Sequence, residues 1–207
     1  MEQGSAEWLA IRLGKVTASR VSDVVAKTKS GYSASRANYM AELIAERLTG
    51  VPAEKFTNAA MQWGTEKEDE ARAAYEFRTG VVVETVAFVA HPRIALSGAS
   101  PDGYVGDAGL VEIKAPNTNT HIDTLLGGSI PAKYETQMLW QMACTGRAWC
   151  DFVSFDPRLP DAMQLFVKRL ERDDKRIAEL ESEVAAFLSD LEERLQKLTA
   201  IYQKEAA

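Results

Sequence analysis

The amino-acid sequence predicts an α/β or α+β domain, in which helices lie before, inside and after a central sheet. Apolar residues recur three and four positions apart in the first 80 residues and again from residue 173 onward, as in amphipathic helices. Between these regions lie short segments rich in Val, Thr and Phe, separated by turn residues. A length of 207 residues suits one buried core, so we expect a single domain over 1–207.

Three helices are expected in the first 80 residues. Segment 19–27 is predicted to form a short helix, and 35–49 a longer one that ends at Gly50. The third is predicted to begin at Thr65-Glu-Lys-Glu68, which has the form of a capping box, and to end near residue 80.

The middle of the chain is predicted to form the sheet. Strands are expected at 81–90, 103–105, 110–114, 148–155 and 164–170. Gly106-Asp-Ala-Gly109 is a strong turn signal between the second and third of these. A helix is expected at 131–145, and one long helix over 173–207, which either packs on its own domain or contacts another subunit.

The charge distribution bears on the class of partner. A formal net charge of -6 disfavours nucleic acid, because phosphate contacts require Lys and Arg. However, residues 1–50 hold seven Lys and Arg against five Asp and Glu, whereas residues 171–207 hold six against ten. The acidic excess is thus concentrated at the C-terminus, and a DNA partner is not excluded.

The sequence also bears on the cellular compartment. No apolar stretch approaches 18 residues, and the N-terminus has neither the basic nor the apolar region of a signal peptide. Cys144 and Cys150 lie in apolar surroundings without a CxxC spacing, as reduced core thiols do. We therefore expect a cytoplasmic protein without membrane contact, disulfide or zinc site.

A candidate catalytic cluster lies between Asp102 and Lys114. Residues two apart share one face of a strand, so Glu112 and Lys114 are expected to point the same way while Ile113 points into the core. The predicted turn at 106–109 would bring Asp102 beside them. Two carboxylates and an ammonium group would then converge on one point.

Such a cluster suits metal-assisted hydrolysis of a phosphodiester. Mg²⁺ prefers oxygen ligands, which Asp102, Glu112 and the main-chain carbonyl of Ile113 can supply, and Mn²⁺ can substitute for it. The ion lowers the pKa of an attacking water, while Lys114 orients that water or neutralises developing charge. Taken alone, a Glu-x-Lys pair is also common on exposed strands and is a weak signal.

The flanking segments turn this pattern into a family resemblance. Ser-Pro-Asp102-Gly followed by Leu-Val-Glu112-Ile-Lys114 resembles the core of PD-(D/E)XK nucleases. Four further segments resemble the family of phage lambda exonuclease and YqaJ-type viral recombinases: Trp8 to Ser19, Trp63 to Arg72, Tyr134 to Gln137, and Phe155 to Arg158. The resemblance covers about residues 5–175. It implies a restriction-endonuclease-like fold, in which a mixed central sheet carries the active residues and helices flank it.

The resemblance also implies roles for residues outside the cluster. Glu68 matches an acidic position that supports the metal site from a helix, although it could instead only cap that helix. Gln137 matches a glutamine that lines the active site, and Tyr134 lies one helical turn before it. Gln141 continues the same stripe, and the alternative is that this stripe is only the polar edge of a core helix.

A further set of residues matches a pocket for the 5′-terminal phosphate of DNA. These are Arg12, Ser19 and Ser100, and Lys29 lies in a loosely matching segment where the relative has an arginine. Arg can bind a phosphate with two hydrogen bonds, and Ser19 at a helix start would direct main-chain N–H groups toward an anion. Ser19 could equally be a plain N-cap, as could Thr17.

The resemblance implies a Mg²⁺-dependent exonuclease that degrades the 5′-ended strand of linear duplex DNA, releases mononucleotides and leaves a 3′ single strand for recombination. It also implies a ring-shaped trimer, a single-strand annealing protein as partner, and a phage or prophage origin in a bacterial cell. Two alternatives remain: an endonuclease or repair nuclease of the same fold, and a non-catalytic protein that binds DNA ends.

Overall fold

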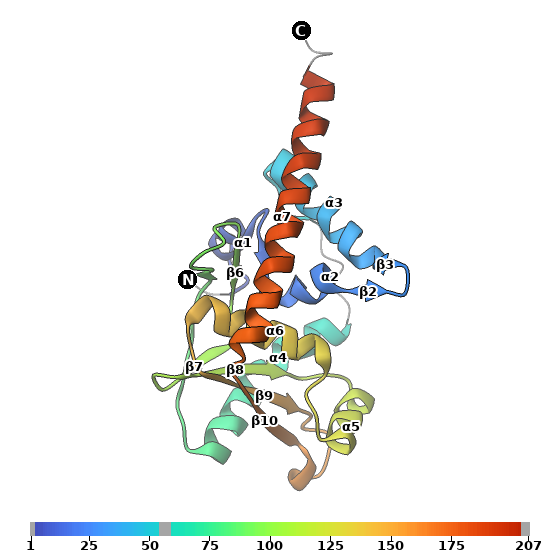
Figure 1. Cartoon of the computed structure of the whole chain (residues 1–207). Helices are drawn as coiled ribbons and strands as arrows, with labels where there is room; N and C mark the ends of the chain where they lie inside the picture. The colour runs from blue at the N-terminus through green and yellow to red at the C-terminus, as the bar shows by residue number, and fades with distance from the viewer. Residues whose placement is uncertain (1–2, 54–58, 204–207) are drawn as a thin grey trace.

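A computed structural model describes residues 3–53 and 59–203 of the chain (Figure 1). Its central element is a five-stranded sheet in the order β10-β9-β8-β7-β4. β8 and β9 are parallel, and the other neighbouring pairs are antiparallel, so the sheet is mixed as predicted. The strands are β4 (Val83–Glu84), β7 (Gly103–Val105), β8 (Gly109–Lys114), β9 (Trp149–Phe155) and β10 (Leu165–Glu171).

Two smaller strand groups accompany this sheet. A three-stranded sheet has the order β1-β6-β5, and β2 and β3 form a hairpin. These strands are β1 (Val16–Thr17), β2 (Lys27–Thr28), β3 (Gly31–Tyr32), β5 (Val89–Ala90) and β6 (Ser97–Ala99).

Helices cover both faces of the central sheet. On one face, Ala71 and Tyr75 of α4 (Ala59–Thr79) pack against Val111 and Ile113 of β8. On the other, Met138 of α6 (Ala132–Thr145) and its neighbours pack against Leu110 of β8 and Phe152 of β9. Full burial of each large apolar side chain contributes about 1.5–3 kcal/mol. The period of two in β8 therefore directs Leu110, Glu112 and Lys114 to the α6 face.

A third apolar cluster joins the N-terminal helices to the long C-terminal helix. Here Tyr39 stacks on Phe187 with ring centroids 5.8 Å apart, and Trp140 of α6 lies in the same cluster. The remaining helices are α1 (Ala6–Arg12), η1 (Ala18–Arg20), α2 (Val21–Val25), α3 (Ala34–Thr49), α5 (Thr118–Gly127), η2 (Asp161–Met163) and α7 (Asp174–Gln203). Figure 1 shows α7 rising from the sheet past α3, with the C-terminal part of this helix projecting beyond the body of the molecule.

Several element boundaries differ from the sequence-based prediction. The short helix ends at Val25, and Ser19 lies inside the preceding 3-10 turn, so Ser19 is not an N-cap. Thr65 lies within α4, which begins before it, so the predicted capping box is wrong. The predicted strand at 81–90 is two short strands, because the chain crosses there from the central sheet to the smaller one.

The other long elements follow the prediction closely. Gly50 and Gly146 end α3 and α6 in the left-handed conformation, with φ of 69° and 74°. In the part of the chain that the structure describes, every helix is too short or too polar to cross a membrane.

Candidate active site

The hairpin of β7 and β8 brings Asp102 to Glu112 and Lys114. Asp102 immediately precedes β7, and the Ile113 N–H donates a 2.6 Å hydrogen bond to its Oδ2. The Lys114 Nζ lies 3.7 Å from the same oxygen and contacts Oε1 of Glu112. The residue after Asp102 is Gly103, where a Cβ atom would collide with Val83 of the neighbouring strand β4. Glycine at this position therefore allows β7 and β4 to pair closely. The predicted convergence of two carboxylates and one ammonium group is confirmed.

Two glutamines of α6 hold Glu112 in place. Gln137 Nε2 donates to Oε1 at 2.6 Å, and Gln141 Nε2 donates to Oε2 at 2.5 Å. Glu112 and Gln141 are both completely buried, so this is not an exposed strand with a surface Glu-Lys pair. The sequence placed Gln141 on the stripe without assigning it a contact. Its spacing of four from Gln137 is the signal that puts both amides on one helix face.

The three predicted metal ligands all face one cation in this structure, the ammonium group of Lys114. It donates to the Ile113 carbonyl at 2.9 Å, besides its contacts with Asp102 and Glu112. These oxygens form the hard donor set that Mg²⁺ prefers, and they already accommodate a positive charge. The set therefore fits a divalent ion. Among the described residues, no group of three or more His, Cys, Asp and Glu side chains is arranged to hold a metal ion.

Burial and charge shift the ionisation of this cluster. Burial raises the pKa of Glu112 to about 7, and the neighbouring Asp102 adds to the rise, although Lys114 and Gln141 oppose it. Burial acts to lower the pKa of Lys114, but Glu112 and Asp102 outweigh it and raise that pKa well above its usual range. Lys114 is therefore a permanent cation, and a second positive charge would favour ionised Glu112.

Glu68 lies with Asp102 in a pocket of about 500 Å³, which we call the carboxylate pocket. It is lined by Gln3, Thr65, Glu68, Asp69, Arg72, Thr85, Val86 and Asp102. Burial raises the pKa of Glu68, and the nearby Asp102 raises it further. Glu68 also forms a 3.2 Å ion pair with Arg72. The structure thus places Glu68 on α4 beside the cluster, and its supporting role remains a prediction.

Tyr134 of α6 also borders the cluster, next to Lys114. Its ring stacks on Phe152 at 5.3 Å, and the Lys114 Nζ lies 5.7 Å from the ring centroid. Gln137 and Tyr134 both reach the cluster from α6, as the resemblance implied.

Arg12 and Ser100 come together at a distance from Lys29. The Arg12 Nη1 donates to Ser100 Oγ at 3.0 Å, and its guanidinium stacks on Trp8, 3.8 Å from the ring centroid. Burial lowers the pKa of Arg12 to about 10. No described carboxylate forms an ion pair with this guanidinium, so its charge is free to bind an anion.

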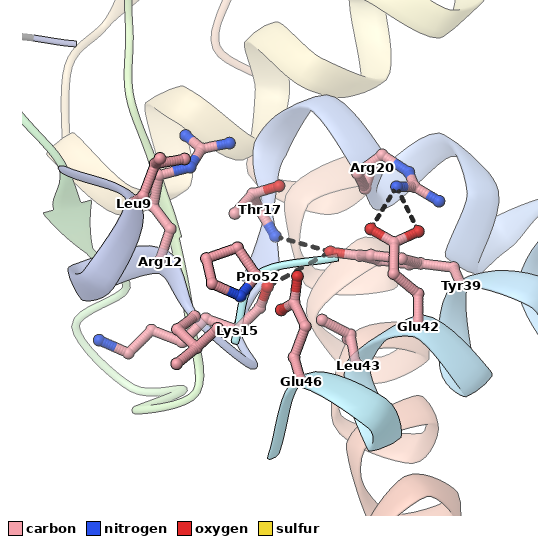
Figure 2. Close-up of a pocket in the computed structure, with 11 residues that line it drawn as sticks. Leu9, Arg12, Lys15, Thr17, Arg20, Tyr39, Glu42, Leu43, Glu46 and Pro52 are labelled. Atoms are coloured by element: carbon pink, nitrogen blue, oxygen red, sulfur yellow. Dashed lines mark hydrogen bonds and ion pairs between the residues drawn. The ribbon is translucent and has the colours of Figure 1, made fainter. Parts of the chain in front are cut away.

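A pocket of about 40 Å³ lies between α1 and α3 and includes Arg12 and Arg20. In Figure 2, Arg20 is paired with Glu42, whereas the head of Arg12 extends away from that pair. The Arg20 pair measures 2.9 Å, so only Arg12 of these two guanidinium groups lacks a carboxylate partner among the described residues.

Ser19 and Lys29 do not contact this pair. The Ser19 hydroxyl lies 3.5 Å from Thr17 Oγ1 and lines a different pocket, next to Lys114. Lys29 is exposed in the turn between β2 and β3, a hairpin that Figure 1 shows projecting from the side of the molecule. Tyr32 of this hairpin donates to Glu183 of α7 at 2.6 Å. Within the described residues, the structure therefore joins Arg12 to Ser100 but brings Lys29 to neither.

Comparisons with known proteins agree with this geometry. Residues 7–148 match the model of the YqaJ-like viral recombinase domain. The chain is 58% identical to an alkaline exonuclease from Laribacter hongkongensis, with 97% of this chain and 99% of that chain covered and a TM-score of 0.90. A second structure of that exonuclease, in complex with dAMP, gives a TM-score of 0.91 at the same identity and coverage.

A more distant structure shares the fold alone. A phage-related exonuclease from Haemophilus somnus is 16% identical, with 89% of this chain and 96% of that chain covered and a TM-score of 0.73. Comparison with curated protein sequences gave no match.

Proposed function

This chain belongs to the family of YqaJ-like viral recombinase domains, and on that premise we propose that it is a metal-dependent exonuclease acting on linear duplex DNA. The observation that carries the proposal is the convergence of Asp102, Glu112 and Lys114, with the Ile113 carbonyl in the same cluster. The relative at 58% identity is named an alkaline exonuclease.

Each residue of the cluster has a distinct part in this proposal. Asp102, Glu112 and the Ile113 carbonyl would hold Mg²⁺ or Mn²⁺, which supplies Lewis-acid activation of water and phosphate. Lys114 would neutralise charge that develops on the phosphate oxygens. Gln137 donates a hydrogen bond to Oε1 of Glu112 and so orients this carboxylate, and the Tyr134 ring packs beside the Lys114 ammonium. Glu68 would support the ion from the carboxylate pocket.

The direction of digestion is proposed to be 5′ to 3′, with release of mononucleotides and a 3′ single strand remaining. Support comes from Arg12, whose guanidinium forms no ion pair among the described residues and donates a hydrogen bond to Ser100, an arrangement that suits a terminal phosphate. Ser19 would contribute from the neighbouring pocket and Lys29 from the hairpin. The relative has been solved with dAMP, which is itself a mononucleotide.

Membership of this family supports a proposal for the biological setting. We propose a phage or prophage protein that acts in the cytoplasm of a bacterial cell with a single-strand annealing protein, assembled as a ring-shaped trimer. Exposed Leu198, Ile201 and Tyr202 on the projecting end of α7 support a subunit contact there.

The test compares Asp102→Ala with Asp107→Ala on end-labelled linear duplex DNA. Asp107 is an exposed carboxylate in the turn between β7 and β8 and serves as the matched control. With Mg²⁺, the rate of Asp102→Ala is expected to fall at least about 10³-fold, because the transition state loses the electrostatic stabilisation that the ion supplies. The variant is expected to keep binding DNA ends. Asp107→Ala is expected to digest normally. Continued digestion by Asp102→Ala would refute the metal assignment.

A further inference from the structure

A second polar pocket is lined by Lys114 and shares no lining residue with the carboxylate pocket. It measures about 260 Å³, and we call it the lysine pocket. Its lining comes from η1, the start of α2, the end of β8 and the first turns of α6. The lining residues are Ser19, Ser22, Lys114, Lys133, Tyr134 and Gln137. All six are polar and none is Asp or Glu, so the pocket presents two positive charges and no carboxylate.

Several donors of the lysine pocket lack a protein acceptor. Within the described part of the chain, neither the Ser22 hydroxyl nor the Lys133 ammonium forms a hydrogen bond or ion pair. Lys133 lies over the Tyr134 ring at 4.6 Å, and Lys114 lies 5.7 Å from the same ring centroid. The Ser19 hydroxyl has only a 3.5 Å contact with Thr17. Two hydroxyls and an ammonium group are therefore available to a ligand that accepts hydrogen bonds and carries negative charge.

Nearby acidic residues do not cancel this charge. Asp23 follows Ser22 in α2, but it pairs with Arg20 at 2.6 Å. Glu135 follows Tyr134 in α6 and pairs with Arg176 at 3.1 Å. Each of these carboxylates has its own arginine, whereas Lys114 is paired with Glu112 and Asp102. Among the described residues, the charge that stays without a carboxylate partner in the pocket is therefore that of Lys133.

We propose that the lysine pocket is a phosphate-binding subsite for the DNA strand that is cleaved, with Lys133 and Ser22 as binding residues. The inference rests on the proposed function. A phosphate next to the scissile one must lie close to Lys114, in or near one of the two pockets. The carboxylate pocket repels it, whereas the lysine pocket attracts it. The volume admits a phosphate with its sugar, and Tyr134 lines the pocket beside Lys133.

The ligand phosphate is either the terminal monoester of a 5′-phosphorylated end or an internal phosphodiester of the same strand. Both present the same anionic oxygens to Lys133 and Ser22. Substrates with 5′-phosphate and 5′-hydroxyl ends separate the two sources.

The experiment measures KM and kcat on linear duplexes with Mg²⁺ for Lys133→Ala, Lys133→Arg and Ser22→Ala. Lys175→Ala and Ser182→Ala, at exposed positions of α7, are the matched controls. Binding without metal is measured by fluorescence anisotropy over a range of salt concentrations. Lys133→Ala is expected to raise KM about tenfold with little change in kcat, as for loss of one phosphate contact. The slope of log binding constant against log salt concentration is expected to fall by about one for Lys133→Ala. Lys133→Arg is expected to restore both the KM and this slope.

The two substrates give two supporting outcomes. An equal rise in KM on both kinds of end assigns the pocket to an internal phosphodiester, and a rise confined to 5′-phosphorylated ends assigns it to the terminal phosphate. The proposal is overturned if Lys133→Ala matches Lys175→Ala in KM and in salt slope. A wild-type protein that releases no nucleotides would refute the proposed exonuclease instead, and the salt slope would still test the pocket.

Discussion

The carboxylate pocket and the lysine pocket share no lining residue, and they differ in the charge that they present. The first holds three carboxylates, of Glu68, Asp69 and Asp102, against the single cation of Arg72, and the second holds Lys114 and Lys133 without an acidic residue. The first therefore attracts cations and the second attracts phosphate. Lys114 belongs to the second pocket but reaches the carboxylates that border the first, so cleavage is expected where the two meet.

The largest expected effect on this comparison comes from Lys114→Met, which keeps the length of the side chain but removes its charge. Hydrolysis is expected to fall at least about 10²-fold, because developing charge on the phosphate is no longer neutralised. Mg²⁺ binding is expected to tighten, because Asp102 and Glu112 lose the cation that they face. Calorimetric titration of the two proteins with Mg²⁺ measures this. Weaker or unchanged Mg²⁺ binding would show that the ammonium and the ion do not share these oxygens.

The second-largest effect is expected from a change at Gln141, which donates a hydrogen bond to Oε2 of Glu112. Gln141→Met removes the donor and leaves that buried oxygen unpaired, so metal affinity or rate is expected to drop about 10- to 100-fold. Gln196→Met, at an exposed position of α7, is the control for a general effect of the substitution. The variant's thermal midpoint is measured beside its Mg²⁺ titration. Normal Mg²⁺ dependence in folded Gln141→Met would contradict the positioning role.

A smaller effect is expected from Glu68→Gln in the carboxylate pocket. Glu68 lies beside Asp102 in this pocket and is expected to support the metal site only indirectly. Removing its charge is therefore expected to raise the Mg²⁺ concentration for half-maximal rate about tenfold and to leave the maximal rate nearly unchanged. Rates measured across a Mg²⁺ series test this. Glu66→Gln, on the exposed face of the same helix, is the control, and identical curves for the two variants would remove Glu68 from the site.

The smallest effect is a pH dependence of stability in metal-free protein. Burial raises the pKa of Glu112 from 4.5 to about 7, so the folded state binds a proton more tightly than the unfolded state. This group therefore lowers stability as pH rises between about 4.5 and 7. Urea unfolding in the presence of a chelator is expected to show a steeper decline for the wild type than for Glu112→Gln. Parallel curves would mean that Glu112 ionises normally.

The convergence of Asp102, Glu112 and Lys114 was predictable, because the strand period and one short turn determine its geometry. The period of two places Glu112 and Lys114 on one face, and the turn at 106–109 returns the chain to Asp102. The long helices were predictable for the same reason, since α3, α6 and α7 have strong helical periodicity and the first two end at glycine.

Other features depend on contacts between segments far apart in the chain. The division of the strand predicted at 81–90 could not be seen in the sequence, because β5 forms only where β6 lies beside it. The capping box failed because α4 continues upstream of Thr65. The lysine pocket joins Ser22 to Lys133, more than 100 residues apart, so local patterns could not reveal it.

We expect this cluster to degrade DNA from its 5′ ends with a divalent ion. The most direct measurement incubates the protein and Mg²⁺ with 5′-phosphorylated linear duplex, 5′-hydroxyl linear duplex and supercoiled circles in parallel. We expect mononucleotides from the linear DNA, fastest from 5′-phosphorylated ends, with circles intact and no product when the metal is chelated. Nicked circles, or digestion that proceeds without a divalent ion, would contradict the account.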